Sequence, residues 1–443
     1  CLIMALYLLL VLFLQTLVLK AELVQVIQLA RHGARTPNSW QPILNQYKEG
    51  NGELTSLGHV QQYFLGKEMR RRYIEETNFL SPTFNASEIV IKSSYKNRTQ
   101  RSAYAFTSGL YPQEDGVWIE NEYGKEFPAE KLLPLKNWKT VQREEIHRIK
   151  IHEDWAKQLI EVIAIEEDYH FHAHENDVCP PAEKMVKDRK KSKEMEALED
   201  FFKMNLYEEL VKGVNTFLQD DSHLNLAMLN LKKAKSVLDN YRCNSFHGLP
   251  HTPFEENIVK LLYKVRYSWA YELLQKDTML KAVQASKLLS EFFDYTKLIK
   301  ENAPNAPKYV FYSAHDTNLE NLFSVFLHED DILMNDHYNI IPFSSVLSIE
   351  VHKETNKDGK EVHKVKLLFN DEPQFIRWCR DYECDLERFH KILTHHMIPD
   401  LEGFCSVGKT PKQAPCAAGV VDCVVEEIEI KASEKLGKVK IDE

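Results

Sequence analysis

Residues 23–37 read LVQVIQLARHGARTP, a hydrophobic segment that runs directly into two arginines and a histidine. The aliphatic and β-branched residues at positions 23–29 predict a half-buried β-strand. Gly33 can adopt backbone angles that are closed to other residues, and Pro37 suits the first turn of a following helix. The segment therefore predicts a strand, a tight turn and a helix, with the charged side chains on the turn.

The same order of elements recurs twice along the chain. Residues 89–94 predict a second strand, which is followed by a predicted helix over residues 99–106. Residues 308–312 predict a third strand, and this strand leads through residues 313–317 into a predicted helix over 318–326. Repeated strand–loop–helix units predict an α/β fold with a mostly parallel, doubly wound sheet.

The loops after these strands carry arginine and histidine side chains that suit an anion. The carboxyl ends of parallel strands lie at one edge of a sheet, so we expect residues that are distant in sequence to converge there. A guanidinium presents a planar fork of donors to phosphate oxygens. Arg31, Arg35 and Arg98 would hold a phosphoryl group for in-line attack, and His315 would add a fourth donor.

His32 and Asp316 would supply the reactive groups of this site. His32 would be the nucleophile, forming a phosphohistidine that water then hydrolyses. It attacks through a nitrogen with a free lone pair, so its other nitrogen should donate to an oriented acceptor. Asp316 would be the general acid that protonates the leaving alcohol, which predicts an acidic pH optimum.

Each motif taken alone also has a simpler interpretation. The segment 31–37 fits a basic surface turn, and the pair His315-Asp316 fits an ordinary helix start with a carboxylate near the cap. The phosphate-site hypothesis rests on the two motifs occurring together.

Together, the motif Arg-His-Gly-x-Arg-x-Pro at 31–37 and the distant His315-Asp316 pair resemble the signature of the histidine acid phosphatases. The similarity to the lysosomal and prostatic branch of this family covers most of residues 22–405. It extends through the following segments: 52–58, 65–67, 70–73, 98–99, 102–103, 312–317 and 384–389.

The resemblance implies a phosphoglycerate-mutase-like α/β domain with an inserted α-helical cap, and an enzyme that needs no metal and no other cofactor. It implies the same site residues as the chemical argument: the phosphate ligands Arg31, Arg35, Arg98 and His315, the nucleophile His32 and the acid Asp316. One position departs from the family pattern. The family usually has an aspartate three residues before its third arginine, where this chain has Tyr95.

Composition and patterning predict the domain organisation. A chain of 443 residues with 44% hydrophobic content can bury a large core. The predicted order is a signal peptide or N-terminal anchor at 1–21, the catalytic domain at 22–145 and 291–423, a helical cap at 146–290, and a charged tail at 424–443. The cap region is rich in Lys and Glu at helical spacing, which favours solvated helix faces.

The chain is expected to be a glycoprotein of the secretory pathway, either lysosomal or secreted. Residues 2–19 form an apolar run, which favours a cleaved signal peptide and leaves membrane anchoring as the alternative. After cleavage, no membrane span is expected. Asn85 lies in a glycosylation sequon. Asn97 also lies in a sequon, but a glycan there would sit beside Arg98, so we do not expect this site to be used.

Eight cysteines agree with an oxidising compartment, and removal of Cys1 with the signal peptide would leave seven. By resemblance, Cys179 pairs with Cys405 and Cys379 pairs with Cys384. The third bridge of the family would use Cys243, but its usual partner position is Ser345 in this chain. Three cysteines therefore remain for one bridge and a free thiol, or for an intermolecular bond: Cys243, Cys416 and Cys423.

His170, His172 and His174 alternate along the chain. An extended segment would place all three imidazoles on one face, where they could bind zinc or copper. We favour a polar loop that leads to Cys179, because no cysteine or carboxylate at metal-site spacing completes the set.

The favoured function is an acid phosphatase that acts on small phosphomonoesters. A phytase-like phosphatase shares both motifs, and a cap lined with additional Lys and Arg would favour it. Two further hypotheses are a phosphoglycerate-mutase-like enzyme and a phosphate-binding protein without catalysis. The net charge of −10 and the pI near 6.0 argue against nucleic acid as a partner, and the prostatic relatives suggest a homodimer.

Overall fold

The predicted strand at 23–29 forms β1 (Glu22–Arg31), the central strand of the sheet in the computed structural model. The structure describes residues 21–38, 47–124, 127–139, 141–175, 178–218, 230–327 and 341–407. The predicted signal peptide up to residue 20, the predicted tail at 424–443, and Cys416 and Cys423 lie outside these residues.

The main sheet has the strand order β10-β8-β7-β1-β6-β2-β5, with β9 paired to β8. The neighbours β1, β6, β2 and β5 run parallel to one another. β7 runs antiparallel to β1 and to β8, so β8 points in the same direction as β1. The α/β class and the mostly parallel sheet are therefore confirmed. The strands besides β1 are β2 (Ile89–Ser93), β5 (Ile160–Val162), β6 (Tyr309–Ala314), β7 (Val346–Thr355), β8 (Glu361–Phe369), β9 (Glu372–Pro373) and β10 (Glu383–Asp385).

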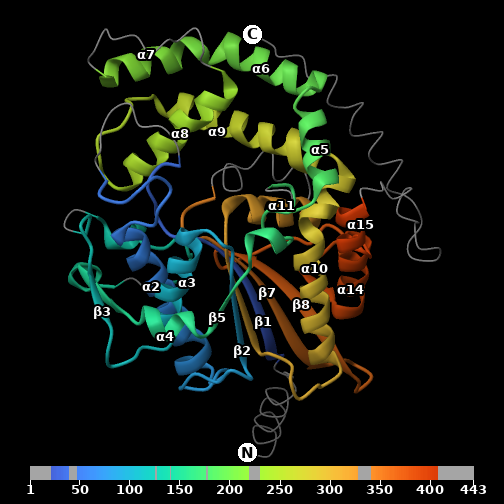
Figure 1. Ribbon diagram of the computed structural model, residues 1–443. Helices are drawn as coiled ribbons and strands as arrows, with labels where there is room; N and C mark the ends of the chain where they lie inside the picture. The colour runs from blue at the N-terminus through green and yellow to red at the C-terminus, as the bar shows by residue number, and fades with distance from the viewer. Residues whose placement is uncertain are drawn as a thin grey trace, which may run out of the picture. The chain divides into compact units, whose positions relative to one another are not determined.

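Helices cover both faces of this sheet, as Figure 1 shows. On one face lie α2 (Ser56–Arg70), α3 (Asn97–Leu110) and the short α4 (Glu153–Lys157), together with a two-stranded sheet of β3 (Val117–Glu120) and β4 (Arg148–Ile151). The other face is covered by α10 (Thr278–Lys300), α11 (Asp316–Phe326) and α14 (Leu386–His395).

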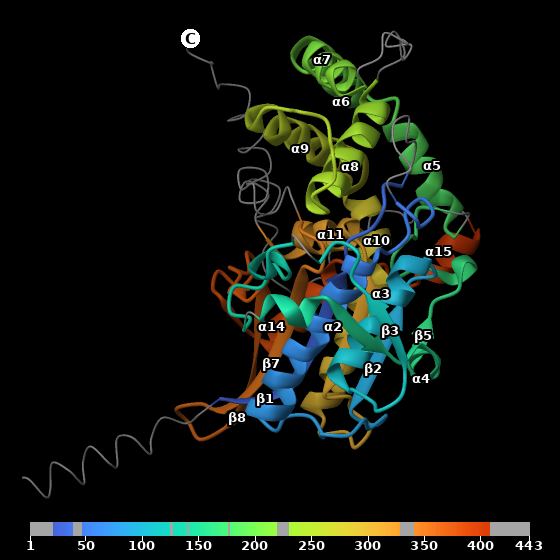
Figure 2. The same cartoon turned by 90° about the vertical axis from the view of Figure 1, so that its left-hand side faces the viewer.

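A third group of helices lies beyond the carboxyl ends of the parallel strands (Figures 1 and 2). We call α5 to α9 the helical cap; their bounds are α5 (Pro180–Arg189), α6 (Lys193–Asn205), α7 (Tyr207–Leu218), α8 (Leu231–Phe246) and α9 (Glu256–Ala270). The cap has a hydrophobic cluster of its own, which includes Phe202, Leu238 and Leu262. α15 (Leu401–Val407) packs against α5 and α10.

The cap begins later in the chain than the predicted boundary at 146. Residues 148–162 contain β4, α4 and β5, and β5 pairs in parallel with β2 in the main sheet. α10 spans the predicted boundary at 290 and contacts β1. β5 has only three residues, which is too short for a periodic pattern to reveal, and the periodicity of α10 does not distinguish a cap helix from a helix that covers a sheet.

The turn after β1 is shaped by contact with α2. A Cβ on Gly33 would lie 2.3 Å from the carbonyl oxygen of Gly58, and a Cβ on Gly58 would lie 2.1 Å from that of Ala34. The φ angle of Gly33 is not positive. The expectation of an unusual backbone angle is therefore wrong: Gly33 is required for close approach. The helix expected directly after Pro37 falls partly on residues 39–46, outside the described residues, and the next described helix is α2.

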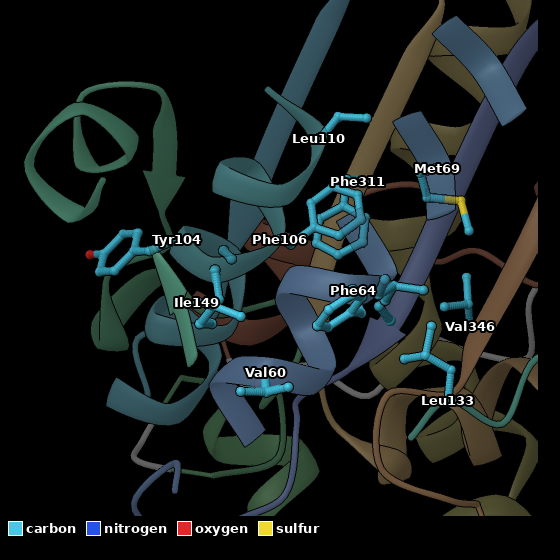
Figure 3. Packing of buried hydrophobic residues seen from close by; sticks show 14 of the residues in the cluster. Val60, Phe64, Met69, Tyr104, Phe106, Leu110, Leu133, Ile149, Phe311 and Val346 are labelled. Carbon is cyan, nitrogen blue, oxygen red and sulfur yellow. The ribbon is translucent and has the colours of Figure 1, made fainter. Parts of the chain in front are cut away.

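α2 and α3 pack closely because each has a glycine at their contact. A Cβ on Gly66 would lie 2.0 Å from the carbonyl oxygen of Phe106, and one on Gly109 would lie 2.0 Å from that of Tyr63. Beneath this contact, the Phe106 ring stacks on Phe311 of β6 at a centroid distance of 3.7 Å (Figure 3). This stacked pair holds α3 against the strands. It thereby fixes the position of the start of α3, which lies near the sheet edge.

We predict that Gly66→Ala lowers the free energy of unfolding by about 1–3 kcal/mol, because the new methyl group meets a backbone oxygen that cannot move alone. The direction of the change in unfolding free energy is informative, because alanine in a helix interior is otherwise favoured over glycine by about 1 kcal/mol. Thermal denaturation would measure the effect. The control is Gly50→Ala, where the Cβ would make only an ordinary contact at 3.6 Å; a Gly66→Ala protein as stable as this control would contradict the packing argument.

Candidate active site

Three strand ends bring the predicted residues together. Arg31 is the last residue of β1 and lies opposite Ala314 of β6, so that the backbone N–H of His32 donates to the Ala314 carbonyl at 3.0 Å. His315 and Asp316 follow directly, at the start of α11. Arg98 is the second residue of α3, which begins shortly after β2. The structure therefore places all six predicted site residues at one edge of the sheet.

The imidazole of His32 is buried and has a defined tautomer. Its Nδ1 lies 2.8 Å from the carbonyl oxygen of Gly33, and a carbonyl only accepts, so Nδ1 carries the hydrogen. The lone pair is then on Nε2. Burial and the positive charges of Arg98, Arg31 and Arg35 hold the pKa of His32 well below its usual value. His32 is therefore a neutral base with a free nitrogen, as the sequence analysis requires of a nucleophile.

Three arginines surround this imidazole, each held differently. The fully buried Arg31 donates from Nη1 to the Ile341 carbonyl at 2.7 Å, and its guanidinium lies 4.1 Å from the centroid of the Phe343 ring. Arg98 approaches Nδ1 of His315 at 3.4 Å. The buried Nε–H groups of Arg31, Arg35 and Arg98 have no hydrogen-bond acceptor among the described residues. Buried donors are normally satisfied, so this arrangement suits an oxyanion.

The electrostatics of the arginines agree with an anion site. Burial and the charge of Arg35 lower the pKa of Arg98 to about 10. Burial and the neighbouring Arg242 likewise hold the pKa of Arg31 well below its usual value. Positive charge is thus concentrated at this edge of the sheet, and a bound anion would relieve the repulsion.

Asp316 is ionised and paired. Its Oδ2 lies 3.1 Å from Nη2 of Arg31, 3.3 Å from Nη1 of Arg242 and 3.9 Å from Nη2 of Arg266. Burial raises the pKa of this carboxyl, but the three guanidiniums outweigh burial and hold its pKa well below the usual value. A general acid must carry a proton, so Asp316 can serve as one only after its electrostatic surroundings change.

The sequence analysis missed the residues that α8 contributes. Asp239 accepts from Nη2 of Arg35 at 2.8 Å and from Nη1 at 3.2 Å, and Arg242 reaches Asp316. The thiol of Cys243 lies 3.5 Å from Nη1 of Arg35. These three positions share one helix face through their i, i+3, i+4 spacing, and this spacing was the available signal. The Lys-rich and Glu-rich surroundings favoured a solvated face instead.

The predicted histidine loop is buried rather than exposed. Among the described residues, no group of three or more His, Cys, Asp or Glu side chains could hold a metal ion. His170 pairs with Glu291 at 2.8 Å, and His172 pairs through Nδ1 with the fully buried Asp168 at 2.6 Å. The ring of His172 also packs against His315, at 4.8 Å between centroids.

Tyr95 is the residue that departs from the family pattern. Its ring packs against that of His172, at a centroid distance of 5.3 Å, and His172 in turn contacts His315. Its backbone carbonyl also accepts a hydrogen bond from the side chain of Gln100. Tyr95 therefore places an aromatic ring against His172, which in turn contacts His315.

The structure contains disulfide bonds between Cys179 and Cys405 and between Cys379 and Cys384, the two pairs that the resemblance implies. Cys243 is a buried free thiol in the described part of the chain. Asn85 lies before β2, and its side-chain oxygen accepts from the hydroxyl of Ser87 at 2.8 Å. Glycosylation of Asn85 stays a prediction.

Comparison with known proteins gives a family match. The model of the histidine phosphatase superfamily (branch 2) matches residues 22–370. The lysosomal acid phosphatase of Xenopus laevis is 26% identical over 400 residues, which cover 87% of this chain and 79% of that protein. The prostatic acid phosphatase of Homo sapiens is 26% identical over 392 residues, which cover 85% of this chain and 86% of the relative.

Solved structures share the fold at lower identity. The phytase of Klebsiella sp. ASR1 has a TM-score of 0.58 and 16% identity, with 86% of this chain and 96% of that chain covered. The Hafnia alvei phytase in complex with tartrate has a TM-score of 0.57 and 15% identity, with coverage of 86% and 98%. At this identity the likeness shows the fold alone. In the described part of this chain, no helix combines the length and apolar character needed to span a bilayer.

We predict that Asp239→Asn strengthens the binding of inorganic phosphate, because it removes a negative charge from the fork of Arg35 while keeping the side-chain shape. The dissociation constant should fall by about fivefold or more, equivalent to about 1 kcal/mol of relieved repulsion. Isothermal titration calorimetry would measure it. Asp200→Asn on α6 makes the same change in net charge at a position 60% exposed. Unchanged or weaker binding in Asp239→Asn would show that Asp239 is needed to orient Arg35.

Proposed function

The chain belongs to branch 2 of the histidine phosphatase superfamily and is a phosphomonoester hydrolase, and we propose that it is an acid phosphatase that forms a covalent phosphohistidine on His32. The observation that carries this proposal is the hydrogen bond from Nδ1 of His32 to the Gly33 carbonyl. It leaves Nε2 free for attack within a ring of arginines, an arrangement that mere anion binding would not need.

The first step transfers the phosphoryl group to the enzyme. Arg31, Arg35, Arg98 and His315 bind the phosphoryl oxygens and neutralise the charge that develops during transfer. The lone pair on Nε2 of His32 forms a bond to phosphorus as the bond to the ester oxygen breaks. Asp316 gives its proton to that oxygen, and the alcohol leaves.

The second step regenerates the enzyme. The Asp316 carboxylate takes a proton from water, and the water oxygen attacks phosphorus as the bond to His32 breaks. Inorganic phosphate then leaves. The low pKa of Asp316 in the ligand-free structure suits this step directly. For the first step, a bound phosphate dianion would share Arg31 with Asp316 and add negative charge beside it, and both effects raise the pKa of Asp316.

The proposed setting is the secretory pathway, in a lysosome or outside the cell. Two disulfide bonds in the structure support an oxidising compartment. Relatives named lysosomal and prostatic acid phosphatases support the same assignment. The signal peptide, the glycan at Asn85, the division into a catalytic domain and a cap, and a homodimer belong to the same proposal.

We predict that His32→Ala abolishes hydrolysis of an aryl phosphate, and that a chelator leaves the wild-type activity unchanged. Acid hydrolysis of the phosphoramidate is fast, so a labelled phosphoenzyme should be trapped by quenching in base. Mass spectrometry should then place the label on His32. His363→Ala on β8, outside the site, is the control and should retain both activity and label. Wild-type protein that binds phosphate without turnover would favour a phosphate-binding protein instead.

We predict a bell-shaped dependence of kcat on pH with its maximum below neutrality. On the acidic side, activity is lost when His32 becomes protonated, and its lowered pKa keeps it neutral well below pH 6.5. On the alkaline side, activity is lost when Asp316 in the substrate complex loses its proton. Asp316→Asn should slow esters of alkyl alcohols by about 10²–10⁴-fold. Esters of acidic phenols need less protonation of the leaving oxygen, so the substitution should slow their hydrolysis far less. An equal loss of kcat for both classes of ester would contradict the general-acid role of Asp316.

A further inference from the structure

Two arginines of the cap face the side of the site where the leaving alcohol would lie. Arg242 of α8 approaches Oδ2 of Asp316 at 3.3 Å, and Arg266 of α9 approaches the same atom at 3.9 Å. The proposed mechanism, on which this inference rests, places the ester oxygen within hydrogen-bond distance of Asp316. The Arg242 guanidinium is therefore about 6 Å or less from that oxygen.

Both guanidiniums are fixed and yet accessible. Arg242 donates to the Ile341 carbonyl, which also accepts from Arg31, and it lies 5.2 Å from the centroid of the Phe343 ring. Arg266 pairs with the buried Glu320. The side chains of Arg242 and Arg266 are 14% and 18% exposed, whereas that of Arg31 is fully buried. Part of each of the two cap arginines is therefore exposed, and a group on the substrate can contact it.

The ion pairs around the site leave an excess of positive charge. Five guanidiniums lie near three carboxylates with which they pair: Arg31, Arg35, Arg98, Arg242 and Arg266 against Asp239, Asp316 and Glu320. A phosphoryl dianion compensates two positive charges. When Asp316 carries the proton that it must donate, Arg242 has no other carboxylate within 4 Å among the described residues, and it lies beside the leaving alcohol.

Lys235 of α8 adds to this excess. Its ammonium group lies 2.9 Å from the centroid of the Trp269 ring, which is a cation–π contact within the cap. Burial and the charge of Arg266 lower the pKa of Lys235 to about 7, so it is protonated in the acidic range where the enzyme is expected to work.

We propose that Arg242 and Arg266 form a subsite for a second anionic group on the substrate, carried by the leaving alcohol a few bonds from the ester oxygen. The favoured substrates are thus phosphate monoesters whose alcohol bears a carboxylate or another phosphate. The two guanidiniums present planar donor forks, which suit either oxyanion. Binding of this group also draws positive charge away from Asp316, which favours the protonated acid.

The test compares two substrates that differ in one meta substituent, which is charged in only one of them. 3-Carboxyphenyl phosphate and 3-carbamoylphenyl phosphate have the same shape, and at mildly acidic pH only the first has an anionic leaving group. We expect the wild type to prefer the carboxylate by about tenfold or more in kcat/KM, as for a charge-assisted pair. Benzene-1,3-diyl bisphosphate, used alongside, shows whether a second phosphate is preferred to a carboxylate.

The ratio of the two kcat/KM values cancels any effect of a substitution on Asp316 that both substrates share, and it keeps what the second anion adds through Arg242 and Arg266. Arg242→Gln and Arg266→Gln should reduce the preference toward unity. Arg242→Lys keeps the charge and should retain much of it, and Lys233→Gln, an exposed cation on the same helix, should retain all of it.

Equal kcat/KM values for the two substrates in the wild type would overturn the subsite, as would a preference that survives in both glutamine variants. In either case hydrolysis itself would still support the proposed function. Failure of the wild type to hydrolyse either ester would instead contradict the proposed function, and the subsite with it.

Discussion

Five guanidinium groups lie around His32 and Asp316, and like charges in a water-poor site repel one another strongly. The structure holds them in place by different means. A backbone carbonyl and the face of Phe343 fix Arg31, whereas carboxylates fix Arg35 and Arg266. The repulsion that these contacts leave uncompensated gives the site its affinity for anions. It also keeps the His32 imidazole neutral, so in the proposed mechanism one electrostatic condition serves both binding and nucleophilic attack.

The sheet edge and the cap both contribute charged groups to the site. The sheet edge supplies Arg31, Arg35 and Arg98, and α8 then adds both a carboxylate, Asp239, and another guanidinium, Arg242. The cap is therefore part of the electrostatic design of the site. A phosphate group that enters the site must compete with Asp239 for Arg35. Protonation of Asp316 must overcome the three ion pairs that stabilise its ionised form. Both requirements favour substrates with a high negative charge.

The sheet edge was predictable from the sequence because its residues lie in local patterns. β1, β2 and β6 are rich in aliphatic, β-branched or aromatic residues, and each motif follows its strand within a few residues. The tautomer of His32 was also predicted as a requirement, but its acceptor, the Gly33 carbonyl, was not. The role of Gly33 itself was misjudged, because its close approach to Gly58 depends on how α2 packs, which no local pattern records.

The contributions of the cap were not predictable in the same way. Asp239, Arg242 and Arg266 reach the site only through the packing of α8 and α9 over the sheet edge, and their local sequence is that of any charged helix. His172 was considered as a metal ligand and assigned to a polar loop instead; in the structure it packs beside His315 and pairs with Asp168. Its partner follows from the fold of a buried loop, and spacing within the sequence does not indicate it.

The place of β1 in the sheet has a consequence for synthesis of the chain. β1 is made first, but its neighbours are β6 and β7, which begin at residues 309 and 346. The central strand thus emerges from the ribosome with both edges unpaired and stays so until β6 is made, which begins 278 residues after the end of β1 (309 − 31 = 278). Exposed edges of this kind invite pairing with other chains. Production of the enzyme therefore depends on protection of its N-terminal strand during translation, and a truncated chain that ends before β6 is a candidate for aggregation.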